Sequence, residues 1–574
     1  MIKDATTQAW RYNEKAKLNA LALEYEENVK PLSMVSEYAQ HLFIFSPDEI
    51  GILRSTIGDY DQSVLEHALS YFTPQNMRVK LISKSLKTTN VCAFYMAEYH
   101  VEKMESTLLD ALCETHTIEA LRLPPPNPYL GEEYQLILPE QGYNSPNKLI
   151  DDKDFRFWFA QDQQFHSPKG DIYMSFDAAS FSDTLESVAA KRIWLGALND
   201  FLQAKYYRAE IAGLHYRIYG HQAGFTLHTR GFTNQQTLLA DQLLEAVKSY
   251  VPDERVFEHH KALQTQSLQN SLLNKPTNRL FSRLSVLIQR NTQAPVELLD
   301  VVGNISYEQL LHYREAAFSR YFVEAFMHGN WTSEEANAFA QAVGHRNKNA
   351  GGEALSRAVS KLPVGKSLYH EVVCDHDDAA IVLYLQAPSP DLTDTALCMV
   401  LEQMLAAPFF NALRTEQQLG YIVGTGYVPH NQHPGMAFYI QSPQCSPKHL
   451  LDATTTFLFQ QLREIEFYRF YWPNIQQNLI KQLEERDLTL SMKSQRLWVS
   501  LGTQDFGFDR NTKLAERIKQ LGFEEILAFA EKLAERQYCG ELILFSRGKY
   551  EAIPHVRERT INDISEFKQQ IPYY

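Results

Sequence analysis

The chain has 574 residues, more than one hydrophobic core supports, because single cores stop growing beyond roughly 250–300 residues. We therefore expect two or more domains. Hydrophobic residues make up 44% and charged residues 22% of the chain, which is typical of globular proteins. The formal net charge of -14, with no long Lys/Arg cluster, argues against nucleic acid as a partner, because a phosphate backbone requires a basic face.

Cysteines and apolar runs exclude further classes. The six cysteines form no CxxC pair, which argues against a zinc ribbon or a thioredoxin-like motif. Residues 1–20 lack the apolar run of a signal peptide, and the sequence gives no compartment. The apolar stretch Cys398–Phe410 is interrupted by Glu402 and Gln403, so we expect no membrane partner and no membrane span.

The first segment, residues 1–120, is predicted to be mainly helical. Residues 8–29 have helical periodicity without a clear N-cap signal, so we expect a domain entered partway. An amphipathic helix at 62–72 and an alternating strand at 77–85 would close an α/β domain. Residues 121–150 contain six prolines and are predicted to form an extended, semi-rigid linker.

Two later segments, residues 151–345 and 346–574, repeat one order of elements. The first is predicted to contain strands at 155–162 and 171–178, a helix at 183–211, a hairpin at 215–233, helices at 236–250, 254–274 and 306–317, and a strand at 322–331. The second is predicted to contain a strand at 379–388, a helix at 393–419, paired strands at 421–429 and 436–443, helices at 447–464, 472–489 and 512–535, and a last strand at 541–548. In both, a helix ends at a glycine before an aromatic strand, which matches Tyr216 with Tyr421 at an offset of 205 residues. This repetition predicts a duplication.

The run FFNALRTEQQLGYIVGTGY (409–427) resembles the insulinase/pitrilysin family of inverzincin zinc metallopeptidases, in which an Arg followed seven residues later by Tyr lies in the fourth domain. The likeness continues in LPPPNPYL (123–130) and FWFAQDQQFHSPKGDIYMSF (157–176). It implies an α+β fold: two duplicated insulinase-like α/β sandwich domains, with mostly antiparallel sheets packed by helices, preceded by part of another such domain. Residues 1–120 would then close the second family domain, 121–150 form the linker, and 151–345 and 346–574 form the third and fourth domains.

The zinc motif of the family is HxxEH, in which two His side chains bind the metal and the Glu acts as base. None of the nineteen histidines starts HxxEH or HExxH, so we predict no metal site and no cofactor in this chain. The resemblance implies that zinc belongs to a first domain that this sequence lacks. His370, Cys374 and His376 would share one face of a strand, but four residues of strand span roughly 13 Å, too far for tetrahedral zinc. His430 and His433 lie in a Pro-bounded turn and are expected to be exposed.

Arg414 and Tyr421 are the candidate catalytic residues. Residues 411–419 have helix-forming composition with Gly420 as the candidate C′ residue, so the chain reverses between the two side chains and both can point to one side. The donors of Arg and the hydroxyl of Tyr can hold a peptide carbonyl and stabilise its tetrahedral intermediate. From the residues alone, an exposed helical Arg and a core Tyr remain the alternative, and the resemblance favours the site.

The resemblance also assigns substrate binding to Phe410 and Asn411, beside the scissile bond, and a core position remains the alternative for Phe410. We expect this chain to be the C-terminal, substrate-binding half of a zinc metalloendopeptidase that degrades peptides. The chain would be inactive alone, because the zinc site would lie on an N-terminal half. The alternative is a non-catalytic subunit that binds peptides or a partner. Expected partners are peptide substrates and the N-terminal half or a homologous subunit; a homodimer through exposed faces is also open.

Overall fold

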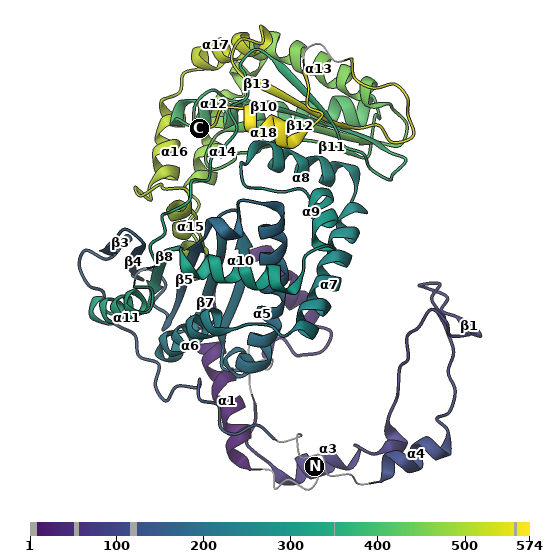
Figure 1. Cartoon of the computed structure of the whole chain (residues 1–574), viewed down its shortest axis with the longest axis vertical. Helices are drawn as coiled ribbons and strands as arrows, with labels where there is room; N and C mark the ends of the chain where they lie inside the picture. The colour runs from purple at the N-terminus through teal and green to yellow at the C-terminus, as the bar shows by residue number, and fades with distance from the viewer. Residues whose placement is uncertain (1–7, 51–56, 115–122, 349, 556–558) are drawn as a thin grey trace. The chain divides into compact units, whose positions relative to one another are not determined.

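The computed structural model describes residues 8–50, 57–114, 123–348, 350–555 and 559–574 (Figure 1). The chain divides into two compact units, Met1–Leu130 and Gly131–Tyr574. The division falls inside the proline-rich segment 121–150.

The first unit consists of helices and one short two-stranded ladder. Its elements are α1 (Ala9–Glu24), α2 (Pro31–His41), α3 (Gln62–Ser70), η1 (Pro74–Asn76), β1 (Asn90–Val91), β2 (Glu98–Tyr99) and α4 (Ser106–Cys113). The helix predicted at 62–72 is confirmed, whereas the strand predicted at 77–85 is wrong. Alternation alone does not make a strand, because a strand needs a hydrogen-bonded neighbour. Among the described residues none pairs with this segment, and Val79, Leu81 and Ile82 stay exposed.

The second unit contains two six-stranded sheets. The first sheet has the order β3-β4-β8-β5-β7-β6. Its strands are β3 (Asn147–Asp151), β4 (Phe155–Gln161), β5 (Lys169–Asp177), β6 (Leu214–His221), β7 (Gly224–Phe232) and β8 (Phe322–Gly329). The predicted strands are confirmed, but β8 inserts between β4 and β5, which the sequence order does not reveal.

The second sheet repeats this arrangement with the order β14-β9-β13-β10-β12-β11. Its strands are β9 (Ser367–Glu371), β10 (Ala379–Gln386), β11 (Ile422–Tyr427), β12 (Gly435–Ser442), β13 (Gly540–Ser546) and β14 (Arg559–Thr560). Both sheets are mostly antiparallel and have a parallel pair in the same place, β4 with β8 and β9 with β13. The second sheet has a further parallel pair, β14 with β9. The duplicated α+β architecture is therefore confirmed.

The two hairpins close differently. The first ends where His221 pairs with Gly224, whereas the second continues past the pair Tyr427–Met436 to a bridge between His430 and His433. Pairing within each sheet does not define which residue of one hairpin matches which residue of the other. The offset of 205 residues between Tyr216 and Tyr421 therefore stays a prediction.

Helices cover the sheets on both faces (Figure 1). The segment between β5 and β9 contains α5 (Leu185–Ile211), α6 (Gln236–Ser249), α7 (Glu254–Leu272), α8 (Pro276–Ile288), α9 (Pro295–Val302), α10 (Tyr307–Ser319) and α11 (Ser333–Arg346). The segment after β10 contains α12 (Leu392–Phe410), η4 (Asn411–Glu416), α13 (Pro447–Arg463), η5 (Ile465–Phe470), α14 (Trp472–Leu483), α15 (Leu490–Gly502), α16 (Arg510–Gln520), α17 (Phe523–Ala534) and α18 (Ile564–Gln570). Five of these helices, α8, α9, α11, α15 and α18, were not predicted from the sequence.

Two of these unpredicted helices cross between the halves of the second unit. Leu280, Leu284 and Leu287 of α8 pack on the second sheet, in one apolar cluster with β10 and β13. Conversely, Leu497, Trp498 and Leu501 of α15 pack on the first sheet, against β4, β5 and β8. Each sheet thus has a face covered by a helix from the other half of the sequence, which joins residues 131–574 into one unit.

The long central helix α12 is apolar enough to be tested as a membrane span. Leu392–Glu416 passes that test by length and hydropathy, and half of its most apolar window is buried inside the protein. Its buried residues, including Leu401, Leu405 and Phe409, pack against the second sheet and its helices. The apolar character of α12 is explained by this core position.

Candidate active site

The helix that carries Arg414 ends differently from the prediction. After Phe410 the α-helix widens into the π-helical turn η4, in which the Gln417 backbone N–H donates to the Ala412 carbonyl at 3.0 Å. The chain then reverses at Gln418, which has a left-handed φ of 53°, so Gly420 is not the C′ residue. A Cβ at Gly420 would lie 2.1 Å from the Gln441 carbonyl oxygen. Glycine is required there because the backbones approach closely, not because of its φ angle.

This reversal brings Arg414 and Tyr421 to the walls of one cavity of about 560 Å³. Its lining also includes Phe410, Thr415, Gln418, Leu419, Gly420, Pro443 and Gln444. Tyr421 is 45% exposed and Phe410 49% exposed, so neither is a core residue. Asn411 is not part of the lining, and its Nδ2 donates to Glu416 Oε1 at 2.7 Å.

Arg414 contributes the unused donors of the cavity. Among the described residues its guanidinium has no ion-pair or hydrogen-bond partner, although the side chain is partly buried. Guanidinium carries five N–H donors in a planar fork and remains charged. A ligand carbonyl or carboxylate that enters the cavity can therefore be bound without breaking an existing contact of Arg414.

Tyr421, in contrast, is held by two buried side chains. Its hydroxyl donates to Asp378 Oδ2 at 2.9 Å and accepts from Gln441 Nε2 at 2.7 Å. Burial raises the pKa of Tyr421, and the adjacent Asp378 carboxylate raises this pKa further, so the phenol is neutral at physiological pH. Asp378 and Gln441 were not predicted from the sequence. The available signal was a polar residue at the end of each apolar strand, 379–386 and 435–442.

The histidines and cysteines that the structure describes do not assemble a metal site. Within the described ranges, no group of three or more His, Cys, Asp or Glu side chains is placed to hold a metal ion. His370 lies on β9 and its Nδ1 bonds the Ile561 carbonyl at 2.8 Å, while Cys374 and His376 lie beyond the end of that strand. The described part of this chain therefore does not fit a zinc ion.

His430 and His433 were expected to be exposed, and this prediction was wrong. They are 6% and 2% exposed and face each other across a two-residue turn. His433 Nε2 bonds the Ala387 carbonyl at 2.6 Å, and its ring stacks on Tyr574. The C-terminal residue covers the turn, and no local pattern in 428–434 reveals a contact so distant in sequence.

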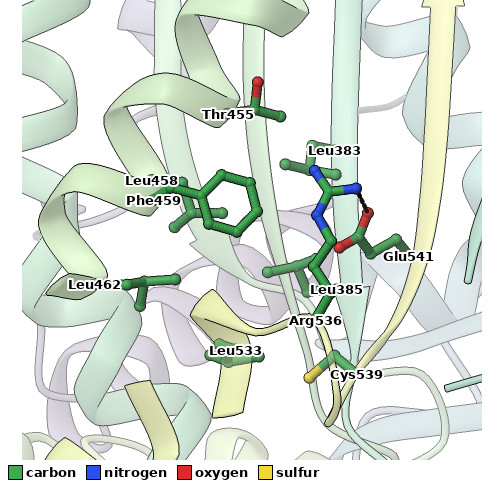
Figure 2. Close-up of a pocket in the computed structure, with 10 residues that line it drawn as sticks. All are labelled: Leu383, Leu385, Thr455, Leu458, Phe459, Leu462, Leu533, Arg536, Cys539 and Glu541. Carbon is green, nitrogen blue, oxygen red and sulfur yellow. Dashed lines mark ion pairs between the residues drawn. The ribbon is translucent and has the colours of Figure 1, made fainter. Parts of the chain in front are cut away.

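A second pocket in the same half lies between α13 and β10 (Figure 2). Leucines surround it, and Arg536 closes one side by pairing with Glu541 at 3.6 Å. Its volume is only about 10 Å³, which is the space of roughly one water molecule. Of these two pockets, the cavity beside Arg414 is therefore the better candidate for a ligand.

Comparisons with known proteins show which family the chain is similar to. Residues 24–301 match the middle or third domain of M16 peptidases, and residues 400–498 match the C-terminal lobe domain 4 of proteins similar to the PQQ synthase PqqF. The insulin-degrading enzyme of Homo sapiens is 26% identical over 544 residues, 92% of this chain and 53% of that protein. The A-factor-processing enzyme of Saccharomyces cerevisiae is 24% identical over 571 residues, 96% of this chain and 55% of that protein.

Solved structures share the fold. The crystal structure of pitrilysin superposes with a TM-score of 0.82 at 22% identity, covering 100% of this chain and 62% of pitrilysin. The M16 peptidase inactive domain from Pseudomonas fluorescens superposes with a TM-score of 0.53 at 14% identity, covering 72% of this chain and 100% of that one. The chain spans about half the length of the curated relatives it matches. Together with the duplicated sheets, these matches confirm the resemblance, and the chain belongs to the insulinase/pitrilysin family of peptidases.

Proposed function

We propose that this chain is the C-terminal, substrate-binding half of a zinc metallopeptidase, in which Arg414 and Tyr421 bind the carbonyl of a peptide held in the cavity beside α12. The observation that carries the proposal is the shared cavity, with a half-exposed Phe410 at its wall. The catalytic metal would lie on another polypeptide segment. The chain alone would bind peptides without cleaving them.

The cavity has the chemistry of a peptide site. Apolar surface from Phe410 and Leu419 can take a side chain, and Gln418 and Gln444 offer amide groups to a peptide backbone. Arg414 offers unengaged cationic donors to a carbonyl oxygen. Such donors stabilise most strongly the oxygen that gains charge in the tetrahedral intermediate, which is the role that fits Arg414.

Fluorescence anisotropy with labelled peptides tests the proposal on the chain itself. Arg414→Ala should weaken peptide affinity about 10–100-fold, because a hydrogen bond to a charged donor contributes roughly 1.5–3 kcal/mol. Arg463→Ala is the matched control, since it removes the same charge from an exposed position on α13 outside the cavity. Absence of peptide binding by the unmodified chain, or equal affinities for Arg414→Ala and the control, would contradict the proposal.

Turnover of a fluorogenic peptide with added zinc tests the other part of the proposal, that the catalytic metal lies on another polypeptide segment. We expect none from this chain alone and activity once a family N-terminal half that carries HxxEH is added. Turnover by the chain alone that a chelator abolishes would show that the chain has its own metal site. Peptide binding without activity in any combination would instead favour a non-catalytic subunit.

A further inference from the structure

The hydrogen bonds around Gln441 define the orientation of its side-chain amide. Gln441 is fully buried on β12, and its Oε1 accepts from the backbone N–H of Thr277 at 3.2 Å and from the Thr277 hydroxyl at 2.8 Å. A backbone N–H donates only to an acceptor, so the oxygen must face Thr277. The NH2 group must then face Tyr421 and Asp378.

That orientation sets the roles of the other two groups. Gln441 Nε2 donates to the Tyr421 oxygen at 2.7 Å and to Asp378 Oδ2 at 2.9 Å. Because the phenol oxygen accepts from Gln441, its single proton points elsewhere, and it lies on Asp378 Oδ2 at 2.9 Å. The only side-chain donor of Tyr421 is therefore occupied in this structure.

Asp378 is well placed to keep that proton. It is only 6% exposed, and a carboxylate accepts a hydrogen bond about twice as strong as a neutral oxygen accepts. Two other groups that can carry positive charge lie nearby. His376 Nδ1 is 3.8 Å from Asp378 Oδ1, and Lys275 Nζ is 5.9 Å from the centre of the Tyr421 ring.

We propose that Asp378 and Gln441 are positioning residues for Tyr421. Gln441, oriented by Thr277 at the start of α8, fixes the phenol oxygen at the cavity wall. Asp378 holds the phenol proton, so a ligand carbonyl has to compete with this carboxylate for it. The positioning of Tyr421 is argued from these side chains alone. Only its effect on peptide binding rests on the function proposed above.

Selective 13Cζ-tyrosine labelling and NMR titration test the positioning without any activity. Tyr421→Phe identifies the Tyr421 signal by its loss. Asp378→Asn preserves the shape of the side chain and removes its charge, so the Tyr421 pKa should fall relative to the unmodified chain. Asp377→Asn is the matched control, because it removes the same charge from an exposed neighbour and should leave the titration unchanged.

Peptide affinity gives the second readout. Asp378→Asn should tighten peptide binding about five-fold. The neutral amide accepts a weaker hydrogen bond than the carboxylate, so the phenol can donate to a peptide carbonyl more readily. The same substitution in a Tyr421→Phe background should have no effect, because no phenol proton remains to compete for. Gln441→Glu and Thr277→Val should each shift the Tyr421 signal, because both alter the contacts that orient residue 441.

The two proposals fail in different ways. An unmodified chain that binds no peptide refutes the proposed function, and the NMR titration still decides the positioning. An unchanged Tyr421 titration in Asp378→Asn overturns the role of Asp378, even when peptides bind. A Tyr421 signal that is unchanged in both Gln441→Glu and Thr277→Val overturns the role of Gln441.

Discussion

The buried turn at His430 should make this protein sensitive to mild acid. Burial, together with a smaller effect of the nearby His433, lowers the pKa of His430 from 6.5 to about 4. The unfolded chain therefore binds a proton at a higher pH than the folded chain does. Because the unfolded state binds more protons in this range, the free energy of unfolding rises with pH between about 4 and 6.5. This contribution is lost as the pH falls through the same range. The full loss is about 3 kcal/mol, of which about 2 kcal/mol falls between pH 7 and pH 5.

His430→Asn isolates this contribution. Asparagine retains an acceptor for Gln289 Nε2, which lies 3.4 Å from His430 Nδ1, and it does not titrate in this range. Urea unfolding at pH 7 and pH 5 should show a smaller acid loss in His430→Asn than in the unmodified chain. Other buried histidines, such as His328, cancel in that comparison. His312→Asn, on the exposed face of α10, is the matched control.

A direct measurement can refute the reasoning. NMR titration of 13C-labelled histidines, with His430 identified through His430→Asn, should give a pKa near 4 for this residue. A value near 6.5, or an equal pH dependence of unfolding in His430→Asn and the unmodified chain, would show that water reaches the ring.

Three further substitutions test the packing. Gly420→Ala places a Cβ 2.1 Å from a backbone oxygen of β12 and should cost about 1–3 kcal/mol by urea unfolding; Gly303→Ala, which meets nothing within 4 Å, should cost little. Trp498→Ala removes a ring that stacks on the Tyr173 ring of β5, with 5.0 Å between the ring centres. We expect the free energy of unfolding to fall by about 3–5 kcal/mol and calorimetry to show separate transitions for the two sheets. Gln418→Gly removes the cost of roughly 1–2 kcal/mol that a left-handed backbone imposes on an L-residue, and it adds about 0.4–1 kcal/mol of unfolded-state entropy. We therefore expect a net stabilisation of about 0.5–1 kcal/mol, and a lower urea midpoint would contradict this.

The cavity itself was partly accessible from the sequence. The spacing of Arg414 and Tyr421 around a chain reversal predicted that both face one side, and both line the cavity. The reversal was assigned to Gly420, whereas Gln418 adopts the left-handed conformation. Local propensity favours glycine at a helix end, but here β12 requires that glycine for close approach.

The groups behind the cavity could not be predicted in this way. Asp378 comes directly before β10, at the end of a polar run, and Gln441 lies near the end of β12, next to Ser442. Only the pairing of these strands, together with Thr277 of α8, places them around Tyr421. Hydrogen bonds between side chains so distant in sequence depend on sheet register, which one sequence does not define.

Periodicity and turn residues in the sequence determined most helices and strands and the duplicated order of elements, because these depend on contacts between near neighbours along the chain. Tertiary structure alone decided that β8 lies between β4 and β5, that α8 and α15 each cover the sheet of the other half, and that Tyr574 buries the turn at His433. The physical reason is that an apolar face specifies burial but not the partner that buries it.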